Sequence, residues 1–269
     1  MDTIITCAGL ARVASVAAAL PLWVSGLLIV VGLPVLVAVV QAVIRRRFPV
    51  LLERRHNDVT GFLLAVIGVI YAVSAGFILL DLHDNYRETR EATRAEALTL
   101  LTVAQASRVM GEEARRRVTE RVLDYERATV ASWPPGTGDE ETVTRALDRL
   151  FDEIAALRPA GEAQKTFVRT ATARLMEVDR QREELRLEAE RGYLEPVLWL
   201  AMIVASAATL GFCLLFGLEQ ARLHYLLVGG VAVVVAVNFF LMVQLDHPFS
   251  GGLSVGPDVH RYVIRELTR

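Results

Sequence analysis

The sequence contains little cysteine, histidine or lysine, and this scarcity argues against several classes of site. Cys7 and Cys213 are the only cysteines among 269 residues, and their separation matches no metal-ligand or redox spacing. The five histidines include no helical pair of the kind that binds zinc in metalloproteases. We therefore expect no metal site and no cofactor.

Catalytic signatures are also missing from the chain. It has no hydrolase, kinase or protease motif, and the glycines of 251–256 lack the Lys-Ser/Thr that completes a phosphate loop. The formal net charge of −2 provides no positive excess for binding nucleic acid. The sequence thus predicts a protein that is neither an enzyme nor a nucleic-acid-binding protein.

Long apolar runs are the main feature that the sequence does have. Hydrophobic residues make up 53% of the chain and charged residues 22%, and the charges lie in separate blocks. A bilayer core of about 30 Å requires roughly twenty apolar residues to cross as a helix. Four runs meet this requirement, and they predict transmembrane helices over residues 22–44, 60–82, 196–218 and 225–245. Pro34 predicts a bend inside the first span.

The segment between the second and third spans has a different composition. Residues 83–192 contain 19 Lys plus Arg and 22 Asp plus Glu. Apolar stripes at helical spacing predict one long helix from Tyr86 to about Ser132, a second from Asp139, and a third after the break at 158–161. No window shows the alternation typical of a strand, so we predict an all-α fold.

These patterns divide the chain into four parts. Residues 1–82 form an N-terminal membrane pair, 83–193 a helical extramembrane domain, and 194–247 a C-terminal membrane pair. Residues 248–269 form a short tail with an amphipathic helix from Asp258 to Thr268. With four spans, both termini and the inserted domain must lie on the same side of the membrane.

The second span carries a stripe of small residues along one face. They recur at spacings of three and four, and they are Gly61, Ala65, Gly68, Ala72 and Gly76. In lipid, such a stripe lets another helix backbone approach closely. We predict that this face packs against a helix, and lining a pore is the alternative.

Ionisable residues at the domain-side ends of the spans are candidate site residues. Asp81, Glu195 and Asp246 end or begin three spans, and His83 and His247 lie beside two of them. Such groups at membrane depth mark ion pathways, whereas at the headgroup level they simply flank helices, and both interpretations stay open. Asn238, inside the fourth span, is a candidate for an interhelical hydrogen bond or for pore lining.

Arginine content predicts the orientation. Five arginines between residues 45 and 58 place this loop on the cytoplasmic side, so the domain and both termini would lie outside. Arginines also flank the membrane on the domain side, which opposes this assignment. Basic residues are almost all Arg, which suggests a high-GC bacterial source and therefore a multi-pass protein of the bacterial plasma membrane.

Several motifs are similar to those of a known family. Asn57 to Phe62 and Gly68 to Ala72 resemble the second-span signature of the bestrophin-like family of bacterial and plant membrane proteins. Further motifs of this resemblance are Glu96-Ala97, Tyr125 with Ser132-Trp133-Pro134, and Leu245 to Gly251. Ser132 departs from the pattern, because the family commonly has an acidic residue before Trp-Pro.

The resemblance implies a distant relation to bestrophins, which are pentameric anion channels with four spans and a large cytosolic helical region. It thus implies a homo-oligomer in the lipid bilayer that passes a small anion or other ion, with the domain inside, contrary to the arginine bias. No pore residue can be carried over. The alternative is a membrane-embedded sensor or scaffold that uses its helical domain for signalling or protein interaction.

Overall fold

The computed structural model describes residues 21–47, 57–136, 138–216, 218, 220–250 and 252–269. None of these residues lies in a strand, which confirms the all-α prediction. The helices are α2 (Leu22–Gly26), the π-helix η1 (Leu27–Val31), α3 (Gly32–Arg47), α4 (Asn57–Ala106), the 3-10 helix η4 (Ser107–Met110), α5 (Glu112–Ala131), α6 (Glu140–Ala156), α7 (Glu162–Arg191), α8 (Pro196–Leu215), α9 (Ala221–Asp246) and α10 (Asp258–Leu267).

In the part of the chain that the structure describes, four helical segments are long and apolar enough to cross a membrane. They are Leu22–Arg47, Thr60–Met110, Pro196–Leu215 and Ala221–Asp246. Each contains or overlaps one predicted span, so the four-span prediction is confirmed. The π turn η1 directly precedes the helical turn that contains Pro34, and the bend predicted at that proline stays a prediction.

The chain divides into two compact units, and each is described by itself. The membrane unit comprises the described residues up to Tyr86 together with Gly192–Ser254. The charged-helix unit comprises Arg87–Arg191 together with Val255–Arg269. The helix α4 contributes to both units, because it runs without interruption through their boundary.

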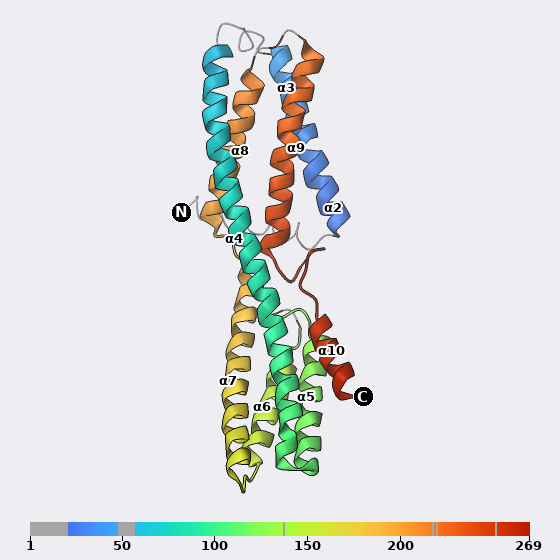
Figure 1. The fold of residues 1–269 in the computed structure, drawn as a ribbon. Helices are drawn as coiled ribbons and strands as arrows, with labels where there is room; N and C mark the ends of the chain where they lie inside the picture. The colour runs from blue at the N-terminus through green and yellow to red at the C-terminus, as the bar shows by residue number, and fades with distance from the viewer. Residues whose placement is uncertain (1–20, 48–56, 137, 217, 219, 251) are drawn as a thin grey trace, which may run out of the picture. The chain divides into compact units, whose positions relative to one another are not determined.

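In the membrane unit, α9 packs against both α3 and α8 (Figure 1). A partly buried polar chain joins these three helices. Arg45 Nη1 lies 3.0 Å from His224 Nδ1, and His224 Nε2 lies 3.2 Å from the Cys213 carbonyl oxygen. Because arginine can only donate, His224 accepts at Nδ1 and donates from Nε2. The first of the loop arginines thus has a structural role in holding α3, α8 and α9 together.

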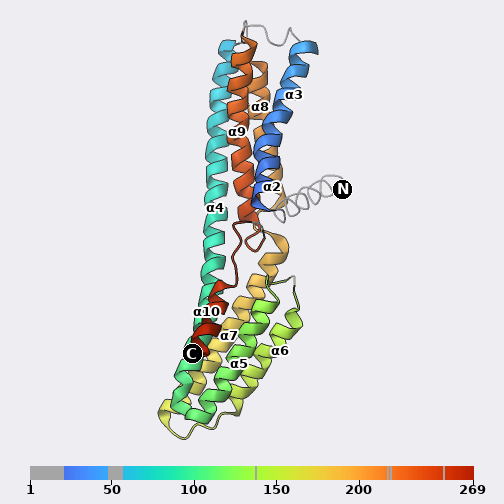
Figure 2. The ribbon, with the colours of Figure 1, turned by 90° about the vertical axis from the view of Figure 1, so that its right-hand side faces the viewer.

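In the charged-helix unit, α5 packs against α6 and α10, and α6 packs against α7 (Figure 2). The apolar stripes of the sequence form the core. Fully buried members of this core come from four helices: Leu100, Val118, Val122, Tyr125, Leu150 and Leu175. The N-terminus of α6 is capped by Asp139, whose carboxylate accepts from the Thr142 backbone N–H at 3.1 Å.

The prediction of one helix from Tyr86 to Ser132 is wrong. The helix α4 ends at Ala106, η4 follows, and α5 begins at Glu112. Between them Gly111 has φ 94° and ψ 164°, a conformation that only glycine adopts readily. This reversal brings Leu100 of α4 and Val122 of α5 into the same core, which a continuous helix could not do.

Candidate functional site

The carboxylate of Asp246, at the end of α9, accepts several hydrogen bonds from residues just before and at the start of α8. Its Oδ1 accepts from the backbone N–H groups of Tyr193 at 3.0 Å and Leu194 at 2.6 Å. Its Oδ2 accepts from Trp199 Nε1 at 3.3 Å, and His247 Nδ1 lies 3.4 Å from the same oxygen. The end of the fourth span thus holds the beginning of the third.

Gly192 makes this arrangement possible. It has φ 71°, and an added Cβ would lie 3.2 Å from Asp246 Oδ2 and 3.3 Å from the His247 ring. Asp246 itself is 3% exposed, and a charge buried to this extent requires several donors. Asp246 therefore has the surroundings of a structural anchor, and its carboxylate is not open to a passing ion.

The other predicted site residues lie in different surroundings. Asp81, His83 and Glu195 are exposed, and Asn238 is half-buried. Of the six candidates, Asp246 and His247 have side chains 3.4 Å apart, and these two residues are already neighbours in the sequence. Asn238 Nδ2 donates to the Val234 carbonyl of its own helix at 3.1 Å, so this hydrogen bond is intrahelical.

The small-residue face of α4 lines a cavity in the membrane unit. The cavity has a volume of about 300 Å³, and α8 and α9 form its other walls. Its lining includes Gly68, Ala72 and Gly76 of the predicted stripe, together with Tyr71 and Asn238. A Cβ added at Gly68 or Gly76 would meet no atom within 4 Å, whereas at Gly61 it would lie 3.4 Å from Phe216. The stripe therefore contacts Phe216 at Gly61, and further along it borders the cavity, where Ala72 and Gly76 are exposed.

A second group of polar residues, not predicted as a site, is buried in the charged-helix unit. Tyr125 on α5 donates to Glu96 Oε1 on α4 at 2.6 Å, and neither residue is exposed. Arg182 on α7 donates from Nη2 to both carboxylate oxygens of Glu140, each at 3.2 Å. Glu140 also accepts from the Gly136 backbone N–H at 2.9 Å. The group joins α4, α5, α6 and α7.

Burial and charge determine the protonation states in this group. Burial and the neighbouring Glu96 carboxylate raise the pKa of Tyr125 well above its usual value, so its phenol stays protonated. Burial alone would lower the pKa of Arg182, but the Glu96 and Glu140 carboxylates outweigh it and raise that pKa. The unit therefore encloses a guanidinium cation that faces Glu140 and interacts with Glu96.

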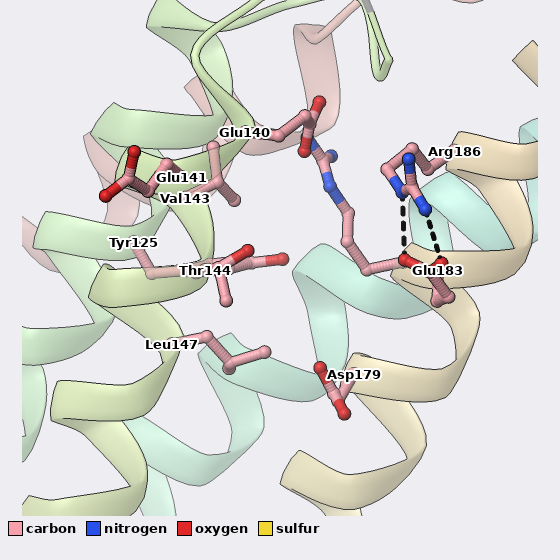
Figure 3. Close-up of a pocket in the computed structure, with 10 residues that line it drawn as sticks. Tyr125, Glu140, Glu141, Val143, Thr144, Leu147, Asp179, Glu183 and Arg186 are labelled. Carbon is pink, nitrogen blue, oxygen red and sulfur yellow. Dashed lines mark hydrogen bonds and ion pairs between the residues drawn. The ribbon is translucent and has the colours of Figure 1, made fainter. Parts of the chain in front are cut away.

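A pocket of about 280 Å³ lies beside this group, between α6 and α7 (Figure 3). Four carboxylates line it, those of Glu140, Glu141, Asp179 and Glu183. Arg186 forms a two-bond pair with Glu183 at 2.6 and 2.9 Å, so part of this charge is neutralised. Among the described residues, no group of three or more His, Cys, Asp or Glu side chains is placed to hold a metal ion.

The spacing of two charged residues in the sequence could have indicated that charged side chains are buried in this unit. Arg182 is four residues after Val178 and three before Leu185, and Glu126 is four residues after Val122. Both charged residues thus occupy apolar-stripe positions. A charged residue at such a position must find a buried partner, but the sequence does not identify which one.

Comparisons with known proteins agree with this architecture. The sequence pattern of the bestrophin-like domain family matches residues 31–259. A single-substitution variant of a bacterial bestrophin homologue from Klebsiella pneumoniae is 15% identical, with a TM-score of 0.69 over 91% of this chain and 99% of that chain. A zinc-phased structure of the bacterial bestrophin homologue from the same organism is 15% identical, with a TM-score of 0.68 over 87% and 94% of the two chains. No curated protein matches the sequence.

Proposed function

Since this chain belongs to the bestrophin-like family, we propose that it is a homo-oligomeric ion channel of the bacterial plasma membrane. Each subunit contributes four spans and one charged-helix unit. The finer part of the proposal is that the ion is a small anion, which follows from the relation to bestrophins. The proposal assigns no catalytic chemistry to the protein.

The uncovered surface of α4 carries the proposal. In the most apolar stretch of this span 11% of the residues are buried, the same share as in Leu22–Arg47, compared with 39% in α8 and 33% in α9. Ala72 and Gly76 are exposed beside the cavity that this face forms with α8 and α9. Because small residues let another helix approach closely in lipid, copies of the chain that meet at α4 would cover this surface.

Exposed charges continue along the same helix. Asp81, His83 and Asp84 directly follow the apolar part of α4, and all three are exposed. In a symmetric assembly around α4, each of them would be repeated once per subunit. Rings of charged side chains control which ions enter a channel. A ring of Asp81 carboxylates would reduce anion entry, so this residue is the best candidate for adjusting selectivity.

The test uses the purified full-length protein in liposomes. We expect chloride flux, together with a native mass that corresponds to an oligomer larger than a dimer. A monomer or dimer without flux would exclude the channel. Reversal potentials in planar bilayers under a KCl gradient give the sign of the preferred ion, and a potassium-selective conductance would contradict the anion proposal while keeping the channel.

A matched pair of substitutions tests the role of α4. Asp81→Asn removes an exposed carboxylate next to the span and is expected to increase the permeability ratio of chloride to potassium. Asp258→Asn removes a carboxylate that is 85% exposed on α10 and should leave the ratio unchanged. Equal ratios in the wild type and in Asp81→Asn would place Asp81 away from the ion pathway.

A sensor or scaffold is the second candidate function, and the continuity of α4 favours it. One unbroken helix of 50 residues extends from the membrane unit into the charged-helix unit. Such an element can transmit a movement between a span and a ligand-binding domain without any flux. A stable oligomer that shows no conductance at any voltage or pH would favour this function over the channel.

A further inference from the structure

The C-terminal helix α10 is attached to the charged-helix unit by a buried pair of ionisable groups. His260 Nδ1 lies 2.7 Å from Glu126 Oε2 on α5, and both side chains are completely buried. The two residues are 134 positions apart in the sequence. Ionisable groups are rarely buried to this extent unless they are paired, so the attachment of α10 depends on this contact.

Neutral contacts surround the pair. Trp133 Nε1 donates to the Val255 carbonyl at 3.1 Å, just before α10, and the Trp133 and His260 rings lie 5.6 Å apart. Val263 on α10 is buried against Ala97 and Leu101 of α4. The Trp133–Val255 bond and the packing of Val263 involve no titrating group, so they provide a constant part of the attachment.

The charges around His260 come from three other helices. Glu126 on α5 pairs with it directly, while Glu96 on α4 and Arg182 on α7 act on it through their charges. On α10 itself, Asp258 and Arg261 pair with each other at 3.2 Å and are exposed. His260 is the member of this set whose ordinary pKa lies nearest neutrality.

Burial and charge act in opposite directions on His260. Burial alone would lower its pKa, but the hydrogen bond with Glu126 and the charges of Glu96 and Glu126 outweigh burial, and the pKa is raised above 6.5. Burial is the main reason why the pKa of Glu126 is raised above 4.5, even though His260 opposes the rise. Docking of α10 beside the Glu126 carboxylate therefore favours the protonated form of His260.

We propose that α10 is a proton-dependent latch, which holds the C-terminal segment on α5 while His260 is protonated and loosens when His260 loses its proton. The sign follows from linkage. A group whose pKa is higher when docked stabilises docking at low pH, and this contribution disappears as the pH rises through the docked-state pKa. A pH slightly below neutrality therefore favours the docked state of α10, and an alkaline pH favours its release.

The position of the latch in the chain makes it relevant to the membrane spans. The fourth span α9 ends at Asp246, and α10 begins at Asp258, so eleven residues connect them. Loosening α10 weakens the hold of the charged-helix unit on Val255–Arg269, the segment that follows the fourth span. The inference goes beyond the proposed channel activity, because docking can be measured whether or not the protein conducts ions.

Hydrogen exchange of the full-length protein in detergent tests the latch directly. We expect the protection of residues 258–267, corrected for the intrinsic pH dependence of exchange, to fall about tenfold or more between pH 6 and pH 9, since a hydrogen bond to a charged group is weakened. Protection of the α6 core, around Leu150, should stay constant. A wild-type profile for α10 that is flat over this range would overturn the proposal.

Three variants separate titration from simple packing. His260→Gln keeps a hydrogen-bond donor without a titratable proton, so its α10 protection should no longer depend on pH. The matched His83→Gln changes an exposed histidine and should keep the wild-type profile. Trp133→Phe removes the bond to Val255 and should lower protection by the same factor at every pH. If His260→Gln and the wild type show the same pH dependence, His260 is not the switch.

A further variant covers the case in which His260→Gln fails to dock at all. Glu126→Gln retains the shape of the side chain but removes its charge, so His260 loses the partner that raises its pKa. We expect α10 to open at lower pH in this variant than in the wild type. An unchanged or higher opening pH would contradict the role of the pair.

Discussion

At the scale of the residue, Asp246 shows how a membrane-face carboxylate can be structural. Three N–H donors and the nearby His247 ring surround its two oxygens. Backbone N–H groups at the entrance of a span lose water when they are buried, and an anion that accepts from two of them satisfies this need. Asp81 has none of these surroundings, because it is exposed.

The two aspartates therefore predict different responses to the same substitution. Asp246→Asn exchanges one accepting oxygen for an NH₂ group, which can only donate. Depending on which way the amide faces, either the bond from Trp199 or the bonds from the two backbone N–H groups are lost. We expect a loss of about 2 kcal/mol in stability, measured as a lower thermal midpoint of the purified protein in detergent. Asp81→Asn should change stability by less than about 0.5 kcal/mol. Similar midpoints for the two variants would show that the Asp246 contacts contribute little.

At the scale of the element, Gly111 separates α4 from α5. A continuous helix would carry Val118 and Val122 away from Leu100, and the core that these residues share could not form. The backbone angles of Gly111 lie in a region that is essentially limited to glycine. The position itself is spacious, since an added Cβ would meet no atom within 4 Å.

Because Gly111 has unusual backbone angles but open space around it, a substitution there tests backbone strain without a steric clash. Gly111→Ala should destabilise the protein by about 1–3 kcal/mol through its φ and ψ angles alone. Gly161→Ala is the matched control, because it also has open space around it and does not have a positive φ. Because Gly161 directly precedes α7 at the N-cap position, where alanine is slightly worse than glycine, the control should cost no more than about 0.5 kcal/mol. Thermal unfolding of both variants in the same detergent measures the difference, and equal midpoints would contradict the strain argument.

At the scale of the whole molecule, orientation depends on two opposing arguments. The arginines of residues 45–58 predict an external domain, while the relation to bestrophins implies a cytosolic one. Residues 48–56 lie outside the described part of the chain, so the structure does not describe most of this loop. Arg45 is hydrogen-bonded to His224, so this arginine has a structural role in addition to any effect on membrane orientation.

Thiol labelling in intact cells distinguishes the two orientations. In a Cys7→Ser background, Glu162→Cys places a thiol where the native side chain is 86% exposed in the charged-helix unit, and Cys213 is buried. On the arginine argument we expect a membrane-impermeant maleimide to label this position. Phe48→Cys serves as the comparison in the arginine-rich loop. Labelling at Phe48→Cys but not at Glu162→Cys would reverse the assignment.

The sequence alone determined the four spans and the all-α fold, because a bilayer core sets the length of an apolar helix and leaves little choice of structure. It also identified the apolar stripes that form the charged-helix core. Motif resemblance pointed to Glu96 and Tyr125 without indicating that they are hydrogen-bonded to each other.

Only the tertiary structure decided which charged residues meet. Glu126 and His260 are far apart in the sequence, and neither has a local pattern that specifies the other. Their pairing follows from the packing of α10 on α5, which depends in turn on the reversal at Gly111. A helical period shows which face of an element is buried, but the partner of a buried charge is set by the three-dimensional arrangement of several elements.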